Sequence, residues 1–137
     1  MTLELSFTVP GEPKGKGRPR FLKTGRTYTP AATVEYERRI ATRAAEAMPC
    51  PPTALPVSVR VDVFNGIPKS WTKARRQRAQ EGLEIPGKPD LDNVAKAVLD
   101  ALNGVVYADD QQVVRLVVQK QYSLDPRLDV RVKELIE

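Results

Sequence analysis

Histidine is missing from this chain of 137 residues, and cysteine occurs only once, at Cys50. Without histidine there is no imidazole general base, no Ser-His-Asp triad and no zinc site with imidazole ligands. One cysteine cannot form an internal disulfide or a cysteine-rich metal site. We expect Cys50 to be a neutral thiol, because no base lies near it in the sequence. Any chemistry must therefore come from carboxylates, from lysine or from a hard metal ion.

Long apolar segments are missing as well. No stretch approaches the roughly 18 apolar residues that a membrane-spanning helix needs. The N-terminus alternates polar and apolar residues instead of showing the apolar run of a signal peptide. We therefore expect a soluble, cytoplasmic protein without a membrane partner. The length suits a single domain over residues 1–137, which can bury a core without disulfides or structural metals.

Positive charge is in excess and unevenly distributed. The chain has 22 Lys and Arg against 17 Asp and Glu, which gives a net charge of +5. Residues 14–26 and 69–78 contain basic side chains and no acid, which favours a nucleic acid as partner, although a solvated surface is the alternative for both segments. The side chains expected to contact phosphates are Lys14, Lys16, Arg18, Arg20, Lys73, Arg75 and Arg76.

Hydrophobic periodicity predicts four strands and three helices. Alternation favours strands at residues 3–9, 57–63, 113–122 and 128–135, and we expect the last two to pair as an antiparallel hairpin. Helices are expected over residues 30–48, 71–80 and 90–102, with Thr29, Ser70 and Asp90 as their N-caps. The predicted fold class is α/β (mixed α+β), with a small mixed sheet of about four strands packed against helices.

Two pairs of aspartates interrupt the basic sequence. Asp90 and Asp92 lie at the predicted start of a helix, and Asp109-Asp110 follows after its end. Taken singly, each has a structural explanation. Asp90 can cap the helix, Asp92 can pair with Lys96 at i,i+4, and Asp109-Asp110 can form a turn.

The combination of these residues points to a metal site. Asp92, Lys96 and Asp100 fall at i, i+4 and i+8, so they share one polar side of the helix. If Asp109-Asp110 folds back onto that helix, several carboxylates converge. Two carboxylates 5 Å apart repel by roughly 3 kcal/mol at an effective dielectric constant near 20.

A divalent cation would offset this repulsion. Carboxylates without histidine or cysteine select hard ions, first Mg²⁺, with Mn²⁺ as a possible substitute. Such an ion can activate a water for attack on a phosphate. Lys96 can orient that water or neutralise charge that builds on the phosphate.

Several segments together resemble the RusA family of Holliday junction resolvases, crossover junction endodeoxyribonucleases that often come from prophages. They are residues 88–104 (KPDLDNVAKAVLDALNG), 107–113 (YADDQQV), 13–21 (PKGKGRPRF), 28–30 (YTP), 35–37 (EYE) and 67–71 (IPKSW). The resemblance implies a small homodimer that uses Mg²⁺ to cut four-way DNA junctions by paired symmetric nicks, in recombination and repair. A two-fold dimer suits a junction of approximate two-fold symmetry.

The resemblance also implies roles for individual residues. Asp90, Asp92 and Asp110 match the metal-binding carboxylates of the family, and Lys96 matches its catalytic lysine, so these four form the expected catalytic set. Asp100 and Asp109 are expected to support them.

Two other functions remain open from the sequence. One is a metal nuclease that acts on other branched DNA, on flaps or on plain duplex. The other is a basic DNA-binding protein without catalysis, in which the aspartates are helix caps.

Overall fold

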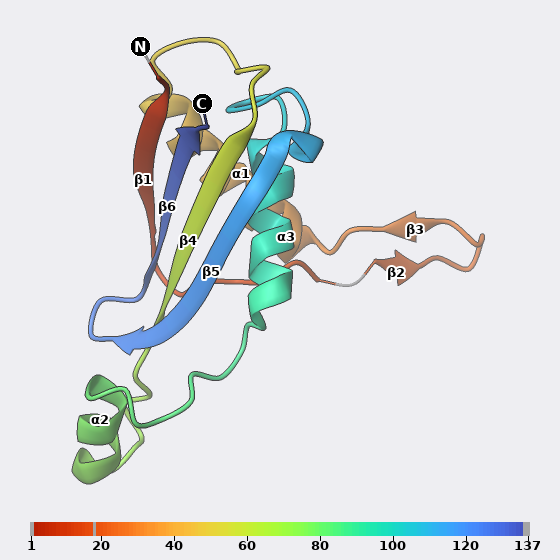
Figure 1. Cartoon of the computed structure of the whole chain (residues 1–137). Coiled ribbons are helices and arrows are strands. Elements are labelled where there is room, and N and C mark those ends of the chain that lie inside the picture. The colour runs from red at the N-terminus through yellow and green to blue at the C-terminus, as the bar shows by residue number, and fades with distance from the viewer. Residues whose placement is uncertain (1, 18, 136–137) are drawn as a thin grey trace.

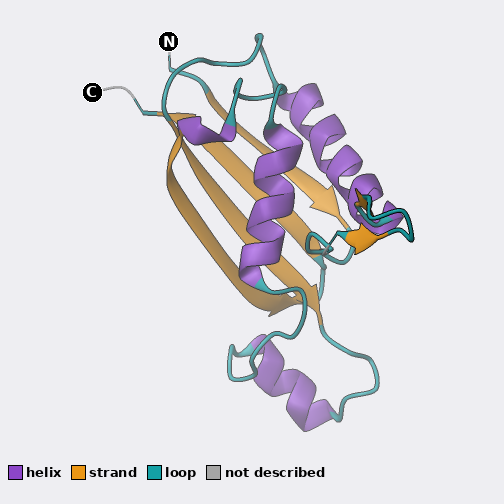
Figure 2. Ribbon diagram, turned by 90° about the vertical axis from the view of Figure 1, so that its right-hand side faces the viewer, coloured by secondary structure: helices purple, strands orange, loops and turns teal. Residues whose placement is uncertain are grey.

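A four-stranded sheet with two helices on one face forms the body of the protein (Figures 1 and 2). The computed structural model describes residues 2–17 and 19–135, so Arg18, one of the expected phosphate contacts, lies outside the described residues. The strands are β1 (Glu4–Pro10), β4 (Val57–Gly66), β5 (Val113–Ser123) and β6 (Arg127–Glu134). Their order is β1-β6-β4-β5, with β4 and β5 parallel and the other pairs antiparallel. The predicted α/β class with a mixed sheet is confirmed.

The predicted hairpin between the last two strands is wrong. β6 lies between β1 and β4, and β5 pairs with β4 alone. Burial explains the difference, because Leu128, Val130 and Val132 on β6 are at most 1% exposed, whereas Val114 and Leu116 on β5 are 62% and 41% exposed. The strand whose apolar side chains are buried on one face takes a central position, and the strand with exposed side chains takes the edge.

Helices α1 (Ala31–Ala47) and α3 (Leu91–Leu102) cover one face of the sheet (Figure 2). Alternate valines of β4 point into the core between the sheet and these helices and are fully buried. α3 adds Val94, Val98 and Leu102, and α1 adds Tyr36 and Ile40. This packing fixes α3 on the sheet and leaves its polar side at the surface.

Two smaller elements lie outside this body. α2 (Lys73–Gln80) lies beyond the end of the sheet, and the short strands β2 (Arg20–Phe21) and β3 (Thr27–Tyr28) form a separate ribbon (Figure 1). Within the residues that the structure describes, no helix has the length and apolar character needed to cross a membrane.

Two of the three N-caps differ from those predicted. Pro30, not Thr29, is the residue before α1, and it makes no side-chain capping bond. Thr72 replaces Ser70 as the cap of α2, because a turn at Pro68–Trp71 delays the helix start. The Thr72 hydroxyl oxygen accepts a hydrogen bond from the Arg75 amide. Asp90 does occupy the N-cap position of α3, but its side chain makes no capping bond.

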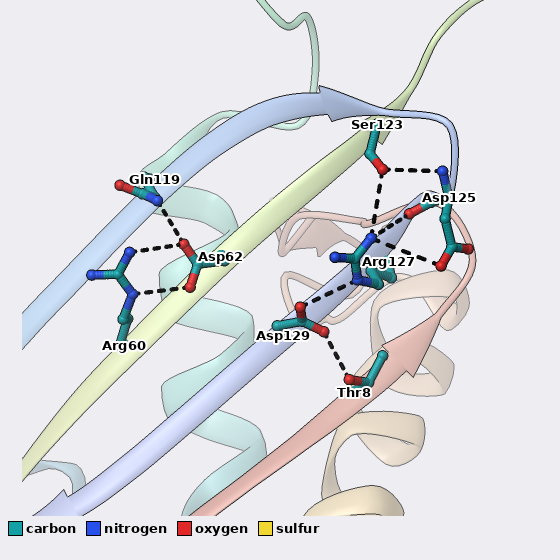
Figure 3. A network of polar contacts seen from close by, with 8 residues as sticks. All are labelled: Thr8, Arg60, Asp62, Gln119, Ser123, Asp125, Arg127 and Asp129. Carbon is teal, nitrogen blue, oxygen red and sulfur yellow. Dashed lines mark hydrogen bonds and ion pairs between the residues drawn. The ribbon is translucent and has the colours of Figure 1, made fainter. Parts of the chain in front are cut away.

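The face of the sheet without helices is polar (Figure 3). Arg60 on β4 donates two hydrogen bonds to Asp62, which also accepts one from Gln119 on β5. On β6, Asp129 accepts hydrogen bonds from Thr8 and from Arg127. Ion pairs on an exposed face contribute little to stability. We therefore interpret these polar side chains as the solvent-facing side of the sheet.

A buried carboxylate ties both chain ends to the body. Glu134 on β6 is 8% exposed and accepts hydrogen bonds from the Thr53 hydroxyl and the Leu3 amide, each at 2.5 Å. These two donors lower the pKa of Glu134. Because the folded-state pKa is lowered, the stabilisation is present above the unfolded-state pKa near about 4.3 and is lost as the pH falls through the folded-state value.

We predict that Glu134→Gln lowers the free energy of unfolding at pH 7 by about 1–2 kcal/mol, since the charged acceptor of one buried and one half-buried donor is lost. The difference from wild type should shrink below about pH 4. Urea denaturation at several pH values measures both effects. Glu4→Gln, at an exposed position of β1, is the matched control and should change stability by less than about 0.5 kcal/mol. An effect of Glu134→Gln that is independent of pH would contradict this account.

Candidate active site

A cleft of about 620 Å³ lies between α3 and the edge strand β5. Its apolar wall consists of Leu91, Ala95, Leu99, Leu116 and Val118. Four charged side chains also line it, namely Asp92, Lys96, Asp100 and Asp110. Three of the four expected catalytic residues therefore share one cleft. Asp90 is not among the lining residues and lies exposed just before α3.

Helix geometry spreads the charged residues along the cleft. Asp92, Lys96 and Asp100 follow one another at intervals of four residues on the side of α3 opposite its buried stripe. A helix rises about 1.5 Å per residue, so the Cα atoms of Asp92 and Asp100 are about 12 Å apart along the axis. Lys96 thus separates a carboxylate near the start of α3 from one near its end.

The segment after α3 places Asp110 at the far end of this row. Tyr107 is fully buried, and its hydroxyl donates a 2.7 Å hydrogen bond to the Leu99 carbonyl, which fixes the segment to α3. Asp109 caps the short 3-10 turn Asp110–Gln112 (η1) by accepting a hydrogen bond from the Gln111 amide. Asp109 therefore has a structural role, and Asp110 is the member of the pair that lines the cleft.

Negative charge accumulates where Asp110 meets the end of α3. The pKa of Asp110 is raised, chiefly by a hydrogen bond with Asp109, with burial and the charges of Asp109 and Asp100 acting in the same direction. The pKa of the Tyr107 hydroxyl is raised by burial and then by the charges of Asp110, Asp100 and Asp109. The aspartate pair thus folds back onto α3 as expected, but near Asp100.

A lysine from the N-terminal loop neutralises part of this charge. Lys16 Nζ lies 2.6 Å from Asp100 Oδ2 and 2.9 Å from Glu37 Oε1 on α1. The three side chains are only 20–30% exposed. Burial opposes the charge of Lys16, but the hydrogen bonds to Asp100 and Glu37 outweigh it and raise the pKa of the lysine. Lys16, expected to contact phosphate, is held within the protein by two carboxylates.

The backbone around Lys16 is also attached to α3. The Lys16 amide donates a 2.9 Å hydrogen bond to the Asn93 carbonyl. Gly15 passes so close to α3 that a Cβ atom there would lie 2.8 Å from Asn93 Cβ. Gly17 donates to Thr33 Oγ1 on α1 at 2.8 Å. The basic loop is therefore anchored between α1 and α3 as far as Gly17.

The other expected phosphate contacts have different surroundings. Lys14 and Arg20 are exposed beside α1 and line a second cavity of about 440 Å³.

On α2, Arg75 stacks on the Trp71 ring at 3.6 Å and also pairs with Glu84 at 3.2 Å. Lys73 is exposed and Arg76 is half-buried, and both lie on α2 at the same end of the molecule as the start of α3 (Figures 1 and 2).

The cleft suits a metal ion in the type of its donors. Carboxylate oxygens are the ligands that Mg²⁺ and Mn²⁺ prefer, and the uncompensated charge at Asp110 would be offset by a cation. The spacing is less complete, because over residues 2–17 and 19–135 no three acidic or thiol side chains are grouped closely enough to hold one ion. The expected convergence of Asp90, Asp92 and Asp110 is thus absent from the structure as it stands.

The sequence analysis missed the roles of Lys16 and Tyr107 as supports of the site. Lys16 and Asp100 are 84 positions apart, so no local spacing could indicate their ion pair. Tyr107 could have been noticed as the single aromatic residue between α3 and the aspartate pair.

Comparison with known proteins identifies the family. A family model described as Endodeoxyribonuclease RusA matches residues 10–133. The chain belongs to the RusA family. It is also 40% identical over 137 residues to the Bacillus subtilis (strain 168) protein named "Uncharacterized protein YqaN", with 96% of each chain covered. The cleft between α3 and β5 is thus found in a chain of an endodeoxyribonuclease family, as the sequence resemblance indicated.

We predict that Lys16 and Asp100 are energetically coupled. Lys16→Met should lower the free energy of unfolding by about 2–3 kcal/mol, because it leaves two partly buried carboxylates facing each other. In Lys16→Met/Asp100→Asn the loss should be smaller than the sum of the single losses by about 1 kcal/mol or more. Urea denaturation of the four proteins gives this coupling energy. Strictly additive losses would mean that the ion pair contributes nothing to the fold.

Proposed function

We propose that this RusA-family protein is a divalent-metal-dependent endonuclease that resolves four-way DNA junctions by paired nicks, in DNA recombination and repair. The observation that supports it best is the single cleft that Asp92, Lys96 and Asp110 line together. These residues come from two separate elements of the fold, α3 and η1. Helix capping does not account for them together, because Asp92 and Lys96 lie inside α3 and Asp109 is the residue that caps η1.

Asp90, Asp92 and Asp110 are the residues that would hold Mg²⁺, with Mn²⁺ as a possible substitute. When bound, such an ion supplies an activated water and stabilises the charge that develops on the phosphate. Asp90 has no capping bond to satisfy, and Asp92 is exposed in the first turn of α3, so both can turn towards a cation. Because Mg²⁺ keeps several waters and takes phosphate oxygens as ligands, two or three carboxylates are sufficient.

Lys96 would act on the substrate. It lies between the carboxylates of the cleft, where its ammonium can orient the attacking water or offset charge on the phosphate. Asp100 has a different role, because it is already paired with Lys16. It holds the N-terminal loop against α3, and we assign it no direct contact with the metal.

DNA would approach across the basic residues around the cleft. Lys14 and Arg20 on the N-terminal side, and Lys73 and Arg76 on α2, are the side chains that we propose contact phosphates. The net charge of +5 favours such a partner. We place Lys16 and Arg75 in a supporting role, because each is paired with a carboxylate of this chain.

A homodimer would present two clefts to the two opposed strands of a junction. The edge strand β5 offers a surface for it, since among the described residues no strand pairs with its outer side. An exposed edge of eleven residues with Val114 and Leu116 at its surface can pair with the same strand of a second copy. Sedimentation equilibrium should give twice the mass of one chain. The mass of a single chain at micromolar concentration would rule out the proposed homodimer.

Cleavage of a synthetic four-way junction tests the proposal. With Mg²⁺, the wild-type protein should nick two opposed strands and leave a linear duplex uncut, and a chelator should stop the reaction. Asp92→Asn should slow cleavage about 100-fold or more while the affinity for the junction stays within about threefold, since charge stabilisation is lost and the basic surface is kept.

Asp125→Asn is the matched control, because Asp125 is 84% exposed in the turn after β5 and lies outside the cleft. It should cut like the wild type. Equal cleavage of flaps or duplex would favour a nuclease for other DNA. Junction binding without cleavage, unchanged in Asp92→Asn, would favour the DNA-binding protein without catalysis.

A further inference from the structure

The ribbon β2–β3 projects from the body of the protein (Figure 1). Its two strands pair at Arg20–Tyr28 and at Phe21–Thr27, and the Leu22 amide donates to the Arg26 carbonyl. Gly25, at φ +85°, lets the chain reverse at the tip. Two short strands are marginal by themselves in water, so a ribbon of this kind is expected to gain order from a partner.

The surface of this ribbon combines aromatic rings with positive charge. Phe21 is 79% exposed and Tyr28 is 43% exposed. Arg20, Lys23 and Arg26 accompany them, and no acid occurs between residues 13 and 34. Exposed aromatic side chains interleaved with cations are the composition of surfaces that bind unpaired or unstacked bases.

The register places the two rings on opposite faces. Residues directly opposite in an antiparallel pair share a face, so Tyr28 lies on the face of Arg20 and Phe21 on the face of Thr27. A base on either side of the ribbon could therefore stack on an aromatic ring. A continuous duplex offers no exposed base faces to these rings, because its bases are stacked on one another. A branch point interrupts the stacking and exposes such faces.

The base of the ribbon is close to the cleft. Lys16 is paired with Asp100, and Arg20 is only four positions further along the chain. Four backbone steps span at most about 14 Å, so a DNA strand held at the start of the ribbon would lie near the carboxylates of α3. The anchored loop at Lys16 thus links the position of the ribbon to that of the site.

We propose that the β2–β3 ribbon enters the branch point of the DNA, where Phe21 and Tyr28 stack on exposed bases while Arg20, Lys23 and Arg26 hold the adjacent phosphates. This inference rests on the proposed function, since it requires a branched DNA substrate. It assigns the preference for branched over linear DNA to the two aromatic side chains and the general affinity for DNA to the charges.

Substitutions at Phe21 test the inference in binding assays with chelator present. Stacking on one base contributes about 1–3 kcal/mol, so Phe21→Ala should weaken binding to a four-way junction roughly 5- to 150-fold. Binding to a linear duplex should change less than about twofold, because the cations are retained. Phe21→Leu should behave like Phe21→Ala, and Phe21→Trp should restore junction affinity, because only Trp keeps an aromatic face.

Leu124→Ala is the matched control, since Leu124 is 71% exposed on the turn after β5 and has no place in the ribbon. It should bind both DNAs like the wild type. If Phe21→Ala keeps the junction affinity, or loses junction and duplex affinity equally, the inference is overturned and the proposed function stands. If the wild type itself does not prefer junctions, the proposed function and this inference fall together.

Discussion

The ion pair of Lys16 with Asp100 is the contact on which the arrangement of the site depends. Its ammonium lies between Asp100 on α3 and Glu37 on α1, so one side chain joins the N-terminal loop to both helices. The charge of Asp100 already contributes to the raised pKa of Asp110, and without Lys16 this repulsion would be larger. The pair also removes Asp100 from the carboxylates available to a cation. Asp92 and Asp110 are the carboxylates of the cleft that we propose for an ion.

The position of Asp110 follows from the topology of the sheet. β4 and β5 are parallel, so the chain must cross over between them, and α3 is part of that crossover. β5 therefore begins near the end of α3, and a short segment brings the aspartate pair beside Asp100. The burial of Tyr107 fixes this segment. The cleft opens at β5 because β5 is an edge strand whose helix-facing side chains are only partly covered.

Much of this arrangement could be predicted from local patterns. Strands and helices with strong periodicity, such as the valines of β4 and the apolar stripe of α3, were located within a few residues. The spacing of Asp92, Lys96 and Asp100 correctly placed them on one side of a helix. Strand order was not predictable in this way, because the burial of β6 depends on partners far away in the sequence. For the same reason, the pairing of Lys16 with Asp100 has no local signal.

The central proposal is that Asp92 and Asp110 would hold the divalent cation while Asp100 would not. Titration with Mn²⁺, followed by electron paramagnetic resonance of the free ion, measures this directly. Asp92→Asn and Asp110→Asn should each weaken Mn²⁺ binding by at least the roughly tenfold that even an outer-sphere change costs. Asp100→Asn should change it by less than about threefold, because Lys16 already neutralises that carboxylate. A loss at Asp100→Asn as large as that at Asp110→Asn, or full affinity in Asp92→Asn, would contradict the account.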